Sequence, residues 1–242
     1  AKDTPNFVAN RIGVFSMAAT IHHTQAFGLS LDLVDALTGP AIGRPKSATY
    51  RTADVVGLDT MGHVFKGSAL ALRDDPWRQY FNPPAWLNAL IEKGALGQKT
   101  KAGIYANKGK QVLDTATGEY RDAGAKPDEA VQALLKIKNP AEKFAALRSS
   151  DHPQAQFLWA IHRDAFHYAA VLLAEIADTA RDVDFAIRWG FGWSMGPFEI
   201  WQAAGWRQVA TWIEEDIAAG KAMTATPLPA WVKQVDGVHR PE

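Results

Sequence analysis

One arrangement of helix and turn signals occurs twice in this chain, and it constrains the fold more than any other feature. A long helical pattern is followed by a short helix near an Asp, a Gly-rich turn, and a helix ending at Gly. The segment from Asp35 to Gly57 matches the segment from Asp184 to Gly205 in length to within one residue. Internal repetition indicates related units that stack and bury a shared face. We therefore expect two tandem helical lobes.

The first long helix is predicted from Pro5 to about Phe27, and it carries an unusual Asn. Pro suits the first helical position, after a Thr that can cap the helix, and Gly28 can end it. Apolar side chains recur at helical spacing at Phe7, Val8, Ile12 and Phe15. Asn10 lies close to this stripe, where an unpaired buried amide costs ~1–3 kcal/mol. Three interpretations stay open: a buried and satisfied amide, a solvated residue at the edge of the stripe, or a side chain aimed into a ligand site.

Composition excludes several classes of function. The 242 residues carry 26 Lys and Arg against 26 Asp and Glu, so the formal net charge is zero. A nucleic-acid surface would need clustered basic residues. The sequence has no Cys, which excludes a disulfide framework and a Cys-ligated metal. We predict no metal site, and no apolar run approaches the ~20 residues of a membrane-spanning helix.

Neighbouring titratable residues do not suggest a catalytic or metal centre. His22 and His23 point about 100° apart on a helix, so they cannot hold one metal together. We expect a solvated or helix-end role for this pair. The run His162-Arg163-Asp164 falls in the middle of a helical pattern, where packing and solvent exposure account for it. The two Asp residues at 182 and 184 are expected to be solvated or to cap helices.

Residues 106–152 are predicted to connect the two lobes, which then comprise residues 1–105 and 153–242. Helical periodicity is lost over residues 106–126. The segments 111–113 and 119–120 flank Thr117-Gly118, which predicts a small hairpin. Two short helices are expected after it, one from Pro127 and one from Pro140.

Three motifs resemble one enzyme family. The run from Lys2 to Arg11 is similar to the first helix of the C-terminal domain of 3-hydroxyacyl-CoA dehydrogenases, Lys-Asp-Thr-Pro-Gly-Phe, two apolar residues, then Asn-Arg. Asn6 stands where the family has Gly, and Asn tolerates unusual backbone angles. The run 97–105 resembles the end of that domain, with Lys101 and Ile104 replacing Gly and Phe. The second lobe repeats the family's Met-Gly-Pro-Phe at residues 195–198.

The resemblance implies a fold and an activity. The fold would be all-α, two tandem lobes similar to the 6-phosphogluconate dehydrogenase C-terminal domain-like fold with a short hairpin in the connector. The activity would be the cytoplasmic, NAD-dependent oxidation of (S)-3-hydroxyacyl-CoA to 3-ketoacyl-CoA in fatty acid β-oxidation. Asn10 is the one position that matches a site residue of the family, where the Asn hydrogen-bonds the reacting end of the acyl chain.

The resemblance also implies partners. The duplicated lobes and the run 43–49 resemble long bacterial β-oxidation proteins, in which a Rossmann domain precedes the lobes and an enoyl-CoA hydratase-like domain often follows. NAD would bind to the N-terminal domain that is missing here, so no cofactor-binding residue is assigned and the fragment alone is expected to be inactive. The second lobe has His162 in place of Asn10 and is predicted to be structural.

Two other interpretations remain. The chain could be a non-catalytic helical interaction module that docks a hydratase or thiolase partner through exposed Trp side chains. It could also belong to another member of the same superfamily that acts on a different hydroxy acid. A Gly-x-Gly-x-x-Gly strand–turn–helix upstream in the reading frame would favour the dehydrogenase over the module.

Overall fold

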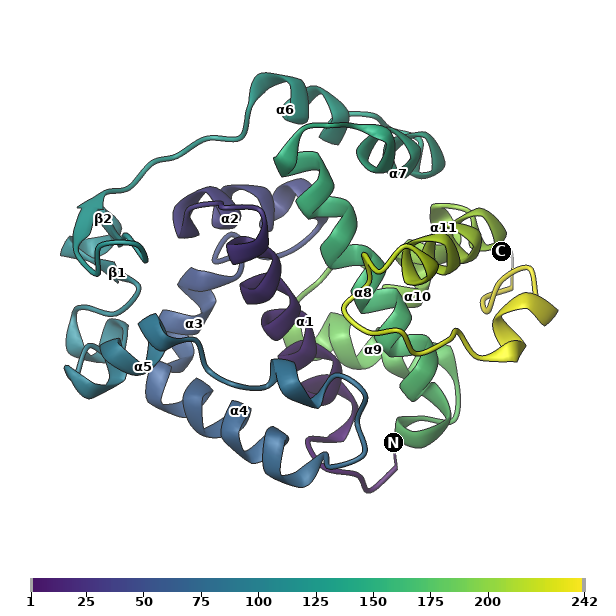
Figure 1. Ribbon diagram of the computed structural model, residues 1–242, viewed down its shortest axis with the longest axis horizontal. Helices are drawn as coiled ribbons and strands as arrows, with labels where there is room; N and C mark the ends of the chain where they lie inside the picture. Colours follow the sequence, from purple (N-terminus) through teal and green to yellow (C-terminus); the bar gives the residue numbers. More distant parts are fainter. Residues whose placement is uncertain (1, 241–242) are drawn as a thin grey trace.

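Two long helices form the centre of the computed structural model, which describes residues 2–240 (Figure 1). Helix α1 spans Phe7–Ala26 and helix α8 spans Pro153–Ile176. They pack antiparallel, since residue numbers rise along one helix as they fall along the other. The contacts run from Arg11 with Glu175, through Phe15 with Tyr168, to Phe27 with Phe157. Most of α8 is buried because other helices surround it.

Four shorter helices follow α1: α2 Leu31–Leu37, α3 Tyr50–Val56, α4 Leu58–Ala71 and α5 Ala85–Glu92. A buried carboxylate orders this region. Asp35 accepts hydrogen bonds from the backbone N–H groups of Thr49, Tyr50 and Arg51, at the start of α3. These groups have no partner within the helix, so the Asp caps it across space. Gly57, at φ +102°, then turns the chain directly into α4.

The start of α1 differs from the prediction. The helix begins at Phe7 rather than Pro5, and the preceding Asn6 has a left-handed backbone with φ +70°. Thr4 therefore does not cap it. Asn is one of the few residues that adopts this conformation readily, which is why it can stand in place of Gly. Its side-chain amide also donates a hydrogen bond to the Ser68 hydroxyl of α4 at 2.7 Å, which fixes the entry to the helix.

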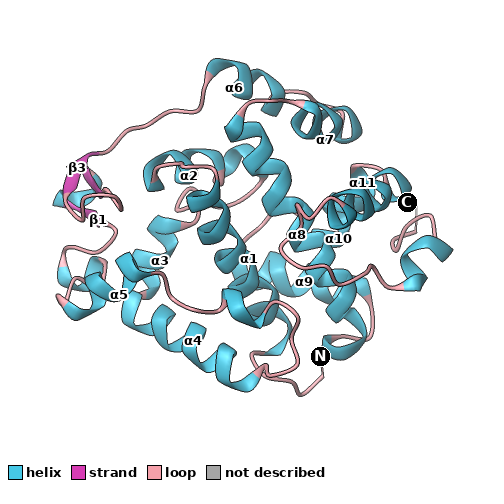
Figure 2. Cartoon of the chain, viewed as in Figure 1, coloured by secondary structure: helices cyan, strands magenta, loops and turns pink. Residues whose placement is uncertain are grey.

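The predicted hairpin is confirmed, with one strand more than expected. Strands β1 Tyr105–Ala106, β2 Gln111–Leu113 and β3 Tyr120–Asp122 form an antiparallel sheet in that order. The Asp54 carboxylate accepts the N–H groups of Ile104 and Tyr105, and Asp32 binds Arg121. Figure 2 shows the sheet at the edge of the molecule beside α2. The sheet therefore crosses the predicted boundary at residue 105.

The rest of the connector packs elsewhere. Helices α6 Glu129–Leu135 and α7 Pro140–Ser149 follow an extended segment, and α7 packs on α8 (Figure 1). The chain after α8 forms α9 Ala180–Phe191, α10 Pro197–Ala203 and α11 Trp206–Ala218. Thr179 and Asp182 cap α9, and Asp184 accepts the Phe198 N–H at the start of α10. Short 3₁₀ turns occur at Pro40–Ile42, Arg78–Tyr80, Gln98–Thr100, Asn107–Gly109 and Ala230–Gln234.

Charged side chains lie buried where α1 meets α8, which the sequence did not predict. His23 is buried rather than solvated, and its Nε2 lies 2.5 Å from the carboxylate of Asp164. Arg163 pairs with the same carboxylate and with Asp216 of α11. Nearer the start of α1, about three turns from His23, Arg11 pairs with Asp75. Because each charge has an opposite partner, the interface tolerates them.

The mostly helical prediction is confirmed in its coarse form. Helices carry the core, and the strands are confined to one small sheet. None of the helices within residues 2–240 combines the length and the apolar character needed to cross a bilayer.

Candidate functional site around Asn10

Asn10 lies in the first turns of α1, on a face that is open to solvent. The interpretation of a buried, satisfied amide is therefore wrong. The side chain makes no hydrogen bond within the described part of the chain, so both its N–H groups and its carbonyl oxygen are available to a ligand. Phe7, the first residue of α1, is also exposed, with 62% of its surface open to solvent.

A cavity of about 230 Å³ opens along the same face of α1. Gly13 and Met17 line it from the helix, one and two turns beyond Asn10. The opposite walls come from residues 44–52 with Val56, and from residues 190–193. The cavity therefore joins the segment that follows α2 to the end of α9, which lies more than 130 residues further along the chain.

Close packing holds these walls together. The ring of Phe191 packs directly against α1 at Gly13. A Cβ atom added to Gly13 would lie 2.0 Å from this ring, so glycine is the residue that fits without moving it. The guanidinium of Arg44 lies 3.8 Å above the ring of Trp193, a cation–π contact. The backbone N–H of Ser194 donates to the Gly43 carbonyl at 2.8 Å. The walls of the cavity are thus fixed by contacts between distant segments.

The chemistry of this site is binding rather than proton transfer. Among the side chains that line the cavity, Arg44 is the charged one, and there is no carboxylate or imidazole. Asn10 does not titrate. The described residues also contain no cluster of His, Cys, Asp or Glu with the geometry of a metal site. The arrangement can hold and orient a polar group beside an apolar one, and a proton acceptor would have to come from outside these residues.

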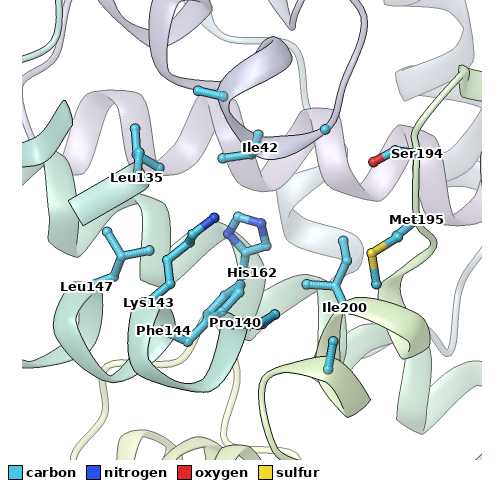
Figure 3. A pocket seen from close by; sticks show the side chains of 13 residues that line it. Ile42, Leu135, Pro140, Lys143, Phe144, Leu147, His162, Ser194, Met195 and Ile200 are labelled. Atoms are coloured by element: carbon cyan, nitrogen blue, oxygen red, sulfur yellow. The ribbon is translucent and has the colours of Figure 1, made fainter. Parts of the chain in front are cut away.

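Sequence reasoning missed a second cavity, which has His162 in its wall (Figure 3). The histidine belongs to the run 162–164 that was attributed to packing and exposure. Its ring is buried, and it points into a space between α7, α8 and α10. The signal that could have found it was the predicted repeat, in which His162 is aligned with Asn10.

Comparisons with known proteins point to one family. The family model described as "3-hydroxyacyl-CoA dehydrogenase, C-terminal domain" matches residues 7–107. A "Probable 3-hydroxyacyl-CoA dehydrogenase" of Bacillus subtilis is 40% identical over 97% of this chain and 29% of its own length. A "Putative fatty acid oxidation complex trifunctional enzyme" of Rickettsia prowazekii is 26% identical over 86% of the chain and 29% of its own length. The chain thus spans less than a third of these relatives.

A solved structure shows the fold. The crystal structure of 3-hydroxybutyryl-CoA dehydrogenase from Escherichia coli matches 96% of this chain and 59% of its own, with a TM-score of 0.64 and 16% sequence identity. The match therefore extends through both halves of the chain, beyond the residues that the family model covers.

Proposed function

We propose that this chain, in which residues 7–107 match the C-terminal domain of 3-hydroxyacyl-CoA dehydrogenases, is the substrate-side part of such an enzyme. The whole protein would oxidise an (S)-3-hydroxyacyl-CoA to the 3-ketoacyl-CoA with NAD. The observation that supports this most directly is the free amide of Asn10, exposed on the face of α1 whose Gly13 and Met17 line a cavity, at the position of the family's substrate-binding Asn.

The proposed role of Asn10 is to hold the substrate oxygen. Its amide N–H donates a hydrogen bond to an alcohol oxygen and equally to a ketone oxygen, so the contact persists as the oxygen changes. A fixed donor of this kind stabilises charge that develops on the oxygen. The exposed Phe7 and the walls around Met17 would keep water from the acyl chain once the rest of the enzyme covers this face.

NAD does not fit the residues described here. The strands between Tyr105 and Asp122 form an antiparallel sheet, and no Gly-rich turn joins a strand to a helix as in a dinucleotide site. The cofactor would supply the hydride acceptor from a separate domain of the longer protein. The lengths of the curated relatives leave room for such a domain.

We also propose that the chain is a tandem repeat of one lobe. Asp35 and Asp184 each accept backbone N–H groups at the start of the next short helix. Arg11 and Arg163 each pair with an Asp at or just beyond the end of the fourth helix of their own half. Gly57 and Gly205 each turn the chain with φ +102°.

The contacts between α1 and α8 are similar at their two ends. Arg11 binds Glu175, which stands twelve residues after Arg163. His23 stands twelve residues after Arg11 and binds Asp164, the neighbour of Arg163. The two pairs are therefore one residue out of register with the proposed repeat. The second lobe would then take the place of a second subunit and bury the face that the first lobe presents.

Replacing Asn10 in the full-length enzyme tests the proposed site. We expect Asn10→Ala to lower kcat/KM for a 3-hydroxyacyl-CoA by about 100-fold, as for loss of one donor to a developing charge. NAD affinity should stay unchanged. Asn88→Ala on α5 is the matched control, because this half-buried amide makes no hydrogen bond within residues 2–240 and lies outside the cavity. Equal turnover of the two variants would remove Asn10 from the site.

One observation favours the interaction module as a second candidate. Trp189 is 81% exposed and stacks on Phe185 with 5.0 Å between ring centres. Large exposed aromatic rings of this kind are typical of protein interfaces. A hydratase or thiolase could dock on them. If this is the only role of the chain, Trp189→Ala will abolish binding of that partner, and the full-length protein will show no dehydrogenase activity.

A further inference from the structure

The cavity at His162 has apolar walls and a polar end. Its volume is about 200 Å³, and it lies where α7, α8 and α10 meet the turn before Gly43 (Figure 3). The apolar walls include Ile42, Leu135, Phe144, Leu147, Met195 and Ile200. The polar side chains in its wall are those of Lys143, His162 and Ser194.

His162 brings an unpaired hydrogen-bond acceptor to this space. Only 4% of the residue is exposed, and Nδ1 lies 2.6 Å from the Leu158 carbonyl oxygen. A carbonyl oxygen only accepts, so the hydrogen is on Nδ1. Burial, together with the charges of Arg44 and Lys143, lowers the pKa of the imidazole to about 4. The ring is therefore neutral at pH 7, and Nε2 keeps its lone pair.

The lone pair has no partner within residues 2–240, and the ring faces the cavity (Figure 3). A ligand O–H or N–H group in the cavity would donate a hydrogen bond to it. The charge at the same end comes from Lys143 of α7, whose amine also lines the cavity. No carboxylate lines this cavity. A negatively charged group of a ligand would pair with the Lys143 amine.

We propose that this cavity binds a hydroxy carboxylate with a short aliphatic tail. The carboxylate accepts a hydrogen bond from Lys143, the hydroxyl donates to Nε2 of His162, and the tail lies among the apolar walls. A cavity of about 150 Å³ holds a benzene ring, so this one takes roughly six to eight non-hydrogen atoms. These are the hydroxyl oxygen, the carbon that carries it and a tail of about five carbons, while the carboxylate lies outside the apolar part, beside Lys143. The site is separate from Asn10, and its occupation does not depend on dehydrogenase activity.

Methionine methyl groups report on the two cavities separately. Met195 lines the cavity at His162, whereas Met17 lines the cavity beside Asn10. The 242-residue chain, labelled with ¹³C at its Met methyl groups, is titrated with racemic 3-hydroxyoctanoate. We expect the Met195 signal to shift and saturate near 1 mM, while the Met17 signal stays in place. Failure of dehydrogenase activity at Asn10 would leave this result unchanged.

Analogues of the probe test each contact in turn. Octanoate lacks the hydroxyl group and should bind about tenfold more weakly, because His162 is left unpaired. 3-Hydroxybutyrate lacks most of the tail and should bind at least tenfold more weakly. Octanoate that binds as tightly as 3-hydroxyoctanoate would overturn the role of His162. A shift at Met17 alone, or no saturable shift below 20 mM, would overturn the site.

Variants connect the binding to the two polar side chains. Lys143→Met keeps the length of the side chain and should weaken both octanoate and 3-hydroxyoctanoate by about tenfold. Lys138→Met, at an exposed position outside the cavity, is its control. His162→Leu should reduce 3-hydroxyoctanoate to the affinity of octanoate, and His162→Gln, which keeps an acceptor, should restore part of the difference. If the His162 variants do not fold, Lys143→Met and the analogues still test the proposal. Unchanged binding of 3-hydroxyoctanoate to Lys143→Met would refute it.

Discussion

Replacing Asp164 by Asn is the sharpest test of the buried charges between α1 and α8. The carboxylate is fully buried and accepts hydrogen bonds from His23 at 2.5 Å, from two nitrogens of Arg163 at 3.0 and 3.2 Å, and from the Met223 N–H at 3.3 Å. Asn has the same shape, but its NH2 group would face a donor of one of these partners, and two donors cannot hydrogen-bond each other. The substitution also removes the negative charge that pairs with Arg163.

The expected loss is about 3 kcal/mol of unfolding free energy near neutral pH. Removing one partner of a buried ion pair costs about 3–5 kcal/mol. The lower end applies, because Arg163 keeps a second carboxylate, Asp216, at 3.1 Å. Asp164→Ala should cost more, since it also leaves a cavity.

The loss should also depend on pH. Burial alone would raise the pKa of Asp164, but the charge of Arg163 and the hydrogen bond from His23 outweigh it and lower the pKa to about 2. In the unfolded chain an Asp titrates near pH 3.9. The ionised group therefore stabilises the fold above about pH 4, and this stabilisation is lost as the pH falls toward 2. Between pH 5 and pH 3 the contribution should decrease by about 1 kcal/mol.

Urea unfolding of the wild type and of Asp164→Asn at pH 7, 5 and 3, followed by circular dichroism, measures both effects. The difference between the two proteins should be largest at pH 7 and 5 and smaller by about 1 kcal/mol at pH 3. A difference below 1 kcal/mol at pH 7 would refute the argument that this carboxylate compensates the buried charge of Arg163. A difference that stays constant from pH 5 to pH 3 would refute the low pKa.

Two further substitutions test the packing, each by urea unfolding against a matched control. Phe15→Ala removes a fully buried ring that stacks on Tyr168 with ring centres 3.9 Å apart, and it should lower the unfolding free energy by about 3–5 kcal/mol. Its control is Leu70→Ala, at a side chain that is 70% exposed, which should change the unfolding free energy by no more than about 0.5 kcal/mol. Equal losses would contradict the assigned core. Gly97→Ala should cost about 3 kcal/mol or more, because φ is +113° and the new Cβ would lie 2.3 Å from a backbone oxygen of Asp54. Gly94→Ala, also at positive φ but with open space around it, should cost only about 1–2 kcal/mol.

The helical elements could be predicted because their signals are local. Apolar spacing from Phe7 to Phe15 and turn residues such as Gly57 and Gly205 act within a few residues, and the structure places helices and turns there. The hairpin at 111–122 was predicted for the same reason, from turn residues between short apolar runs. The third strand was missed because two residues, Tyr105 and Ala106, are too few to show an alternating pattern.

The start of α1 shows where local signals fail. Thr4 and Pro5 together form a good helix start, yet the helix begins at Phe7. The chain enters through a left-handed Asn6, whose amide is bound to Ser68 on another helix. A contact across more than sixty residues thus outweighs a local preference of about 1 kcal/mol for a cap.

The sequence by itself determined the helical class, the order of its helices and turns, and the position of Asn10 in a family motif, because periodicity and motif spacing are properties of the chain alone. Only the tertiary structure decided burial. In the structure, Asn10 is exposed on the face of α1 that carries a cavity. His23 is buried against Asp164, and the His162 side chain points into a second cavity. The physical reason is that burial and pairing depend on which distant segment covers a side chain, and the partner of His23 is 141 residues away.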